Sequence, residues 1–238
     1  MTTRDSRESP VKSLFVVSLP RSLSTVIYHA AIRSVGLDEP RWTSDGEILN
    51  LDRFVLFPGP RRDVGRKFLR KDSEPDVFFD AMAFLDQVAA PTGYGYKDVV
   101  QPFLVSEWIT RSGVRAIRIK RSVADVAYAM LNGRWRYPAR LFPRTKDVEL
   151  ALLKGLVLAD RALDAMPAQQ IDFDQIILDE APVQAALATL YGHRPIKRVR
   201  FIDVRFKQVR EQILKRRQTS RHRAIADRVA KVLERHRR

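Results

Sequence analysis

The apolar positions of the first readable segment change their spacing after Leu19. Residues 14–17 are four consecutive apolar residues, a pattern typical of a short strand buried on both faces of a parallel sheet. From Val26 to Val35 the apolar residues return at helical spacing, and Gly36 marks the end of that helix. The residues between are rich in hydroxyl groups and include one arginine. The pattern therefore predicts a strand, a tight turn and a helix.

The same arrangement occurs again at residues 114–131. Residues 114–120 alternate apolar and basic side chains as a strand does, and a helical pattern follows directly after Arg121 and Ser122. Further helices are expected within 77–90, 101–112, 147–166 and 183–191, strands at 41–43 and 169–173, and two basic helices after residue 204. Alternating strands and helices predict an α/β fold of three layers, in which helices flank a central, mostly parallel sheet.

Both polar turns carry features that favour anion binding. The first turn contains Pro20, Arg21, Ser22, Leu23, Ser24 and Thr25, and the second contains Arg121 and Ser122. Backbone N–H groups at a helix N-terminus have no partner within the helix, and the helix dipole favours negative charge there. Hydroxyl groups and an arginine at such a turn therefore predict an anion-binding loop.

Composition limits the class of protein. The chain has 238 residues, of which 45% are hydrophobic, enough for one α/β domain, expected over 12–204 with a basic helical extension over 205–238. It has no cysteine and four scattered histidines, so no metal is expected. No apolar run approaches the roughly 18 residues of a membrane span, and the first residues are polar. The sequence predicts a soluble cytoplasmic protein.

Positive charge dominates the chain. Lysine and arginine total 43 and aspartate and glutamate 28, which gives a net charge of +15. Such a surplus attracts anions of many kinds without selecting among them. Much of it lies late in the chain, at Lys215, Arg216, Arg217, Arg221 and Arg223. This run is compatible with a solvated helix face or with an anion site.

The two turns together resemble the nucleotide-binding motifs of sulfotransferases that use 3′-phosphoadenosine 5′-phosphosulfate. The family's first motif is a strand followed by P-[KR]-S-G-[ST]-T and a helix; residues 20–25 are similar, with Leu23 in place of the glycine. The second motif, R-x-P-x-D-x-x-x-S after a strand, is similar to Arg121 and Asp125, with Val123 in place of proline and Ala129 in place of serine. The first turn lacks the glycines of a Walker A loop.

Two longer segments extend the resemblance over Leu14–Gly192. Residues 96–121 resemble the family's stretch from a lysine-containing strand to the second motif. Residues 171–192 resemble a later family segment, with Phe173 and Asp174 in its aromatic and acidic positions. The motifs occur in the family's order, and this order carries more weight than any single match.

This resemblance implies a P-loop-like sulfotransferase fold and an adenosine donor as cosubstrate. By that resemblance, residues 20–25 hold the phosphosulfate, and Arg121 with Ser122 holds the 3′-phosphate. The acceptor would be a hydroxyl or amine of a small molecule, glycan or lipid. Transfer depends mainly on positioning and charge stabilisation, so no metal is required once arginines neutralise the donor.

Two residues are candidates for the base that takes the acceptor's proton. Gly46 and Glu47 stand where a branch of the family that includes the tyrosylprotein enzymes has its catalytic glutamate, so Glu47 is preferred. His29, one turn into the first helix, is the rival. An ordinary acid at a helix N-terminus and an ordinary packed histidine are the alternatives for these two positions.

Other functions are also compatible with the sequence. One alternative is a polyanion-binding or nucleic-acid-binding protein, although nucleic acid is not expected because no such fold is recognisable and few aromatics lie near the basic tail. A P-loop-like kinase or an inactive sulfotransferase relative is another. The acceptor pocket is expected at loops 54–72 and 133–146. Their arginines, Arg61, Arg62, Arg134 and Arg136, favour an acidic or phosphorylated acceptor. The last amphipathic segments could also pair in a homodimer.

Overall fold

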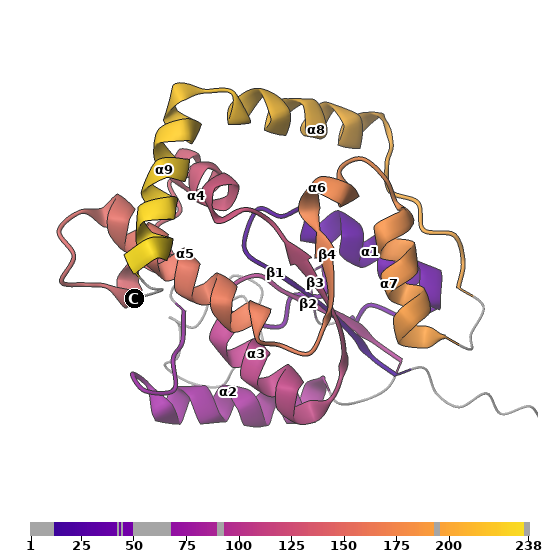
Figure 1. Ribbon diagram of the computed structural model, residues 1–238. Helices are drawn as coiled ribbons and strands as arrows, with labels where there is room; N and C mark the ends of the chain where they lie inside the picture. Colours follow the sequence, from indigo (N-terminus) through magenta and orange to yellow (C-terminus); the bar gives the residue numbers. More distant parts are fainter. Residues whose placement is uncertain are drawn as a thin grey trace, which may run out of the picture.

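A four-stranded parallel sheet forms the centre of the fold (Figure 1). The structure is a computed structural model that describes residues 12–41, 43, 45–49, 68–89, 93–192 and 196–235. The strands are β1 (Leu14–Ser18), β2 (Gly95–Asp98), β3 (Arg115–Lys120) and β4 (Gln169–Asp172), in the order β2-β1-β3-β4. The α/β class and the parallel sheet predicted from the sequence are confirmed.

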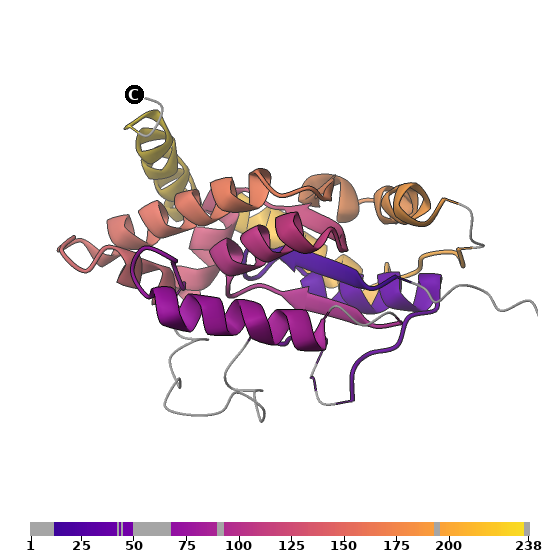
Figure 2. The same ribbon diagram turned by 90° about the horizontal axis from the view of Figure 1, so that it is seen from below.

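Helices cover both faces of the sheet. On one face pack α2 (Pro75–Val88), α3 (Pro102–Ser112), α4 (Val123–Asn132) and α5 (Val148–Asp164), and on the other α1 (Ser24–Val35), α6 (Phe173–Ile176) and α7 (Ala181–Tyr191) (Figure 2). Strand β1 explains this arrangement, because Phe15 and Val17 join the first hydrophobic cluster while Leu14 and Val16 join the second. A strand with apolar residues on both faces requires cover on both sides.

Local signals in the sequence set several helix ends. Gly36 and Gly113 end α1 and α3 in the left-handed conformation, with φ of 71° and 63°. Asp147 caps α5 by accepting a hydrogen bond from the backbone N–H of Leu150 at 3.0 Å. A 3₁₀ helix at Tyr137–Leu141 interrupts the loop between α4 and α5.

The strand expected at 41–43 is wrong for its described residues. Arg41 lies in a turn, and the backbone N–H of Thr43 donates to the Pro40 carbonyl at 2.9 Å, which closes a tight turn instead of a ladder. Instead, two isolated β-bridges pair Asp38 with Tyr94 and Glu47 with Lys97. The segment therefore meets the edge of the sheet at isolated points.

The basic C-terminal helices pack onto the rest of the fold. Helix α8 (Val204–Arg217) crosses from the α7 side of the molecule to the α4 side, and α9 (Ser220–Arg235) runs back along α4 and α5 (Figure 1). Helix α9 contributes Ile225, Val229 and Val232 to the hydrophobic cluster that contains α4 and α5. Helix α8 contributes Phe206 and Ile213 to the cluster that contains α1 and α7. The domain boundary at residue 204 stays a prediction.

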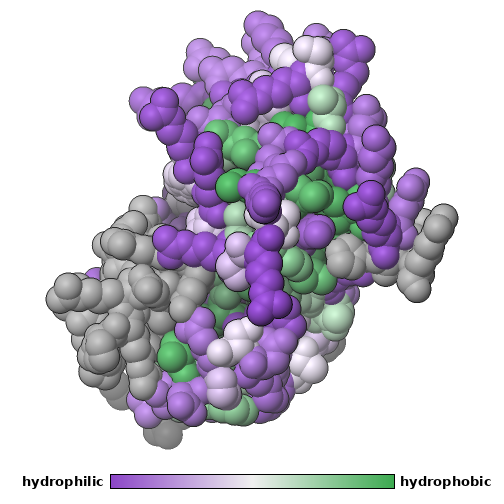
Figure 3. All heavy atoms as spheres, turned by 90° about the vertical axis from the view of Figure 1, so that its left-hand side faces the viewer, coloured by the Kyte–Doolittle hydropathy of each residue, from purple (hydrophilic) through white to green (hydrophobic). Residues whose placement is uncertain are grey.

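The face of the molecule that carries α9 is largely polar (Figure 3). On the side that carries α9, hydrophilic side chains cover most of the described surface, and apolar residues show between them (Figure 3). Within the described ranges, no helix combines the length and the apolar character needed to cross a membrane.

Buried Asp125 anchors the C-terminal helices. Its side chain is 3% exposed and accepts from Arg217 Nε at 2.9 Å and from His222 Nε2 at 2.7 Å. Arg121 Nε lies 3.7 Å from the same carboxylate. Burial alone would raise the pKa of Asp125, but the hydrogen bonds and charges of these partners lower it below its ordinary value.

Asp125→Asn should therefore lower the free energy of unfolding by about 3 kcal/mol at pH 7, since it leaves buried Arg121 and partly buried Arg217 without their anion. A lowered pKa means that this stabilisation is present above the unfolded value near 3.8 and is lost as the pH falls through the folded value. Urea unfolding from pH 7 to pH 3 measures the difference. Asp227→Asn, an exposed site on α9, is the control. A difference that stays constant down to pH 3 would contradict the ion-pair role.

Candidate functional site

The chain changes direction across the sheet between β1 and β3. From β1 it continues to β2 on one side, and from β3 to β4 on the other. Ser18 lies opposite Ile119 in the parallel register, so both strands end at the same edge. Ligands of open α/β sheets bind at such a switch point, outside the carboxyl ends of the strands.

Arg21 and Arg121 meet at this edge. The Arg121 Nη1 group donates a hydrogen bond to the backbone carbonyl of Arg21. Both residues line one cavity of about 680 Å³, which we call the strand-edge cavity. Its other lining residues come from the first turn, the sheet edge, α4 with its following loop, and α8: Pro20, residues 22–26, Glu47, Val99, Ala129, Asn132, Gly133, Trp135, Val209, Ile213 and Arg216.

The first turn has an unusual backbone. Arg21 and Leu23 adopt left-handed φ angles of 64° and 56°. Leu23 occupies the position where the sulfotransferase motif has glycine, and glycine is the residue that takes this conformation at no steric cost. The Ser22 hydroxyl is buried and donates to the Leu19 carbonyl at 2.7 Å, so Ser22 can offer the cavity only its backbone N–H as a donor.

The two arginines differ in their surroundings. Arg21 is exposed and has no ion-pair partner among the described residues. Arg121 is 7% exposed, its Cζ lies 4.4 Å from the centroid of the Phe173 ring, and burial lowers its pKa to about 10. Its buried Nε has no hydrogen-bond partner in the structure. Both guanidinium groups therefore retain N–H groups for a ligand.

Segments of the resemblance that are far apart in sequence converge here. Phe173 lies under Arg121, and Asp174 Oδ1 pairs with Arg217 Nη2 at 2.5 Å. Arg216, from the basic run, also lines the strand-edge cavity. Within the basic run, Arg217 therefore forms ion pairs with Asp125 and Asp174, whereas Arg216 adds positive charge to the cavity.

No family model matches the sequence, and no curated protein matches it significantly. A solved structure described as a sulfotransferase domain from the curacin biosynthetic pathway matches with a TM-score of 0.50 over 94% of this chain and 98% of that one. The chain has a sulfotransferase fold. Sequence identity is 13%, so the likeness confirms the predicted fold, and the roles of single residues stay predictions.

In this sulfotransferase fold, Glu47 belongs to a buried polar cluster. Lys97, which is 1% exposed on β2, pairs with Glu47 Oε1 at 2.9 Å and donates to Thr25 Oγ1 at 2.5 Å. Lys97 thereby connects the candidate base to the first turn of α1. The resemblance placed a lysine-containing strand at the start of residues 96–121 but gave Lys97 no role, although a lysine inside a buried strand is a signal for one.

Two further groups lie near this cluster. Asp98 accepts from the backbone N–H groups of Val100 at 3.1 Å and Gln101 at 2.7 Å, and burial raises its pKa to about 7. The Tyr137 hydroxyl is buried without a hydrogen-bond partner in the structure. Burial raises the pKa of Tyr137, and the charges of Asp98 and Glu47 raise it further. The end of β2 thus collects several titratable groups.

The structure does not bring His29 or Ser122 into the strand-edge cavity. His29 Nε2 lies 3.2 Å from Asp45 Oδ1, and its ring lines a separate hollow of about 570 Å³. Asp45 and Glu39 both hold the ring on that side of α1. Ser122 is exposed at the N-cap of α4. Glu47 is therefore the candidate base that this geometry favours.

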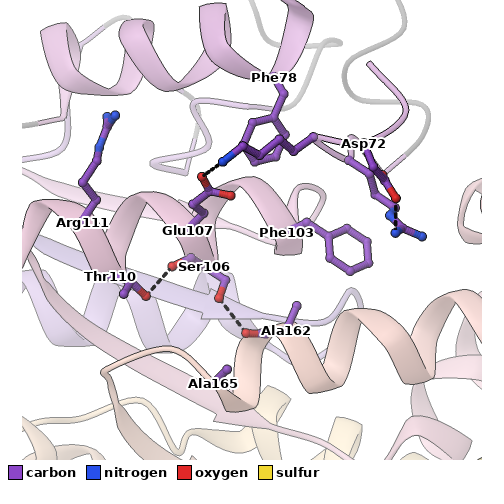
Figure 4. Close-up of a pocket in the computed structure, with 11 residues that line it drawn as sticks. Asp72, Phe78, Phe103, Ser106, Glu107, Thr110, Arg111, Ala162 and Ala165 are labelled. Atoms are coloured by element: carbon purple, nitrogen blue, oxygen red, sulfur yellow. Dashed lines mark hydrogen bonds and ion pairs between the residues drawn. The ribbon is translucent and has the colours of Figure 1, made fainter. Parts of the chain in front are cut away.

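A larger groove of about 850 Å³ lies between α2, α3 and α5 (Figure 4). Its apolar surface includes Phe78 and Phe103, and its rim cations already have partners: Lys71 with Glu107, Arg70 with Asp72, and Arg111 with Asp86. No candidate donor or catalytic residue lines it. The smaller cavity is the better anion site, because Arg21, which lines it, forms no ion pair with any described residue.

The loops expected to hold the acceptor are only partly described. Residues 54–67, including Arg61 and Arg62, lie outside the described residues. In the loop 133–146, Gly133 and Trp135 line the strand-edge cavity, whereas Arg134 and Arg136 do not. No group of three or more metal-ligating side chains occurs in the described part of the chain.

Two substitutions test the backbone of the first turn. Leu23→Gly should stay within about 1 kcal/mol of the wild-type stability, because relief of the left-handed penalty offsets lost packing. Leu23→Val should be at least about 1 kcal/mol less stable than Leu23→Gly, since β-branched residues tolerate this conformation poorly. Urea unfolding compares them. A valine variant as stable as the glycine variant would contradict the left-handed backbone.

Proposed function

We propose that the chain is a sulfotransferase that moves a sulfuryl group from 3′-phosphoadenosine 5′-phosphosulfate to a hydroxyl or amine of a small molecule, glycan or lipid. The observation that carries this proposal is the meeting of Arg21 and Arg121 at one cavity that also contains Glu47. The sulfotransferase fold supports it.

The residues present suit this donor. The donor carries two separate anionic groups, so its site needs two sources of positive charge at one sheet edge. Arg21 and the N-terminus of α1 provide one, and Arg121 provides the other. Ala129 offers no hydroxyl to the 3′-phosphate, and Arg216 in the same cavity supplies a cation instead.

Each residue then has a defined task in the transfer. The acceptor oxygen forms a bond to sulfur as the bond from sulfur to the phosphate oxygen breaks, and the acceptor proton passes to the Glu47 carboxylate. Arg21 stabilises the charge that develops on the departing phosphate. Lys97 holds Glu47 in place through the 2.9 Å ion pair. The products are 3′,5′-adenosine bisphosphate and a sulfate ester from a hydroxyl acceptor, or a sulfamate when the nitrogen of an amine attacks in the same way.

Glu47→Gln tests this assignment. The variant should bind 3′,5′-adenosine bisphosphate at least as tightly as the wild type, measured by calorimetry, because the substitution keeps the size of the side chain and removes a negative charge from the anion site. Its release of that product from the donor, with p-nitrophenol or water as acceptor, should fall by about 100-fold or more, since general-base catalysis contributes that much.

Glu107→Gln, an exposed carboxylate in the groove beside α3, is the matched control and should retain full turnover. A wild-type protein that neither binds the bisphosphate nor consumes the donor would contradict the proposed function. Equal turnover by Glu47→Gln and the wild type would remove Glu47 as the base.

A further inference from the structure

The ring of Trp135 lies against the guanidinium of Arg21. The Arg21 Cζ atom is 4.3 Å from the ring centroid, and both residues line the strand-edge cavity. Trp135 is a large aromatic residue that is 43% exposed at this place. Nothing in the motif resemblance accounts for a tryptophan here, so its position calls for a physical explanation.

The turn after α4 brings Trp135 to this place. Gly133 follows the last residue of α4, and Arg134 adopts a left-handed φ of 58°, which reverses the chain. The backbone N–H of Trp135 donates to the Met130 carbonyl at 2.9 Å, which fixes the turn against the helix. A Cβ on Gly133 would lie 3.3 Å from Arg21 Nη2, so the glycine leaves room for the guanidinium.

A stacked aromatic ring and an ion-paired carboxylate contact different parts of an arginine guanidinium. A carboxylate would occupy the N–H edge of the guanidinium, which is the edge that binds phosphate or sulfate. An aromatic ring contacts the flat face instead and leaves that edge available. Arg21 has no ion-pair partner among the described residues, and the ring of Trp135 is stacked on its guanidinium. The ring therefore restricts the motion of the guanidinium without occupying the N–H groups that would bind an anion.

We propose that Trp135 is a positioning residue for Arg21, which stacks on the guanidinium and keeps its N–H edge free for the anionic group of the donor. The identity of that donor rests on the proposed function, but the stacking rests on the contact alone. The structure leaves one rival explanation, in which Trp135 contacts the base of the nucleotide directly.

A double-mutant cycle separates the two explanations. Trp135→Leu should weaken binding of inorganic pyrophosphate and of 3′,5′-adenosine bisphosphate by the same factor, about fivefold, as expected for loss of a stacked cation. Trp135→Phe, which keeps an aromatic face, should recover most of the affinity. In an Arg21→Ala background, Trp135→Leu should have no further effect on either ligand.

Each outcome decides the proposal. If Trp135→Leu lowers the affinity for the bisphosphate but not for pyrophosphate, or still lowers it in the Arg21→Ala background, Trp135 contacts the base and the proposal is overturned. Binding of pyrophosphate without binding of the bisphosphate would contradict the proposed function, while the coupling of Trp135 with Arg21 would still be measured with pyrophosphate. If the wild type binds neither anion, both proposals fail. Circular dichroism of each variant checks that the fold is retained.

Discussion

The hydrogen bond from Arg121 to the backbone carbonyl of Arg21 joins the two loops on which the site depends. It can form because β1 and β3 are adjacent and parallel, so their carboxyl ends deliver both loops to one edge. The ring of Phe173 and the carboxylate of Asp125 both contact the Arg121 side chain, and Asp125 also pairs with Arg217 and His222 of the C-terminal segment. One buried arginine thus couples the sheet edge, the first turn and the basic tail.

Charge is distributed unevenly around this edge. Carboxylates near the cavity are already engaged: Asp125 binds Arg217 and His222, and Glu47 binds Lys97. Two cations that line the cavity, Arg21 and Arg216, form no ion pair within the described part of the chain, and Arg21 contacts an aromatic ring instead. This contrast explains why the larger groove beside α3, where cations and carboxylates alternate, is the poorer anion site. Part of the net charge of +15 is therefore concentrated at this edge of the sheet, where Arg21, Arg121 and Arg216 line one cavity.

The sequence predicted the sheet edge better than the side chains around it. Four apolar residues in β1, the alternating β3 and the glycines after α1 and α3 carry short-range signals, so these elements and the parallel sheet followed from the pattern. The segments that carry Lys97 and Trp135 were expected near the site, but neither residue was given a role, because their contacts depend on the pairing of β2 with β1 and on the turn after α4. The contacts of His29 could not be predicted for a similar reason: helical spacing gives the face of α1 on which it lies, but its neighbours Asp45 and Glu39 come from a later loop.

The central claim is that one cavity binds both charged ends of an adenosine nucleotide. Calorimetry with 3′,5′-adenosine bisphosphate, 5′-AMP and 3′-AMP tests it most directly, with Arg144→Ala as an exposed control of equal charge. The wild type should bind the bisphosphate at least about tenfold more tightly than either monophosphate, because each phosphate meets its own arginine. In Arg21→Ala the bisphosphate should bind no better than 3′-AMP. An unchanged preference for the bisphosphate in that variant would contradict the account.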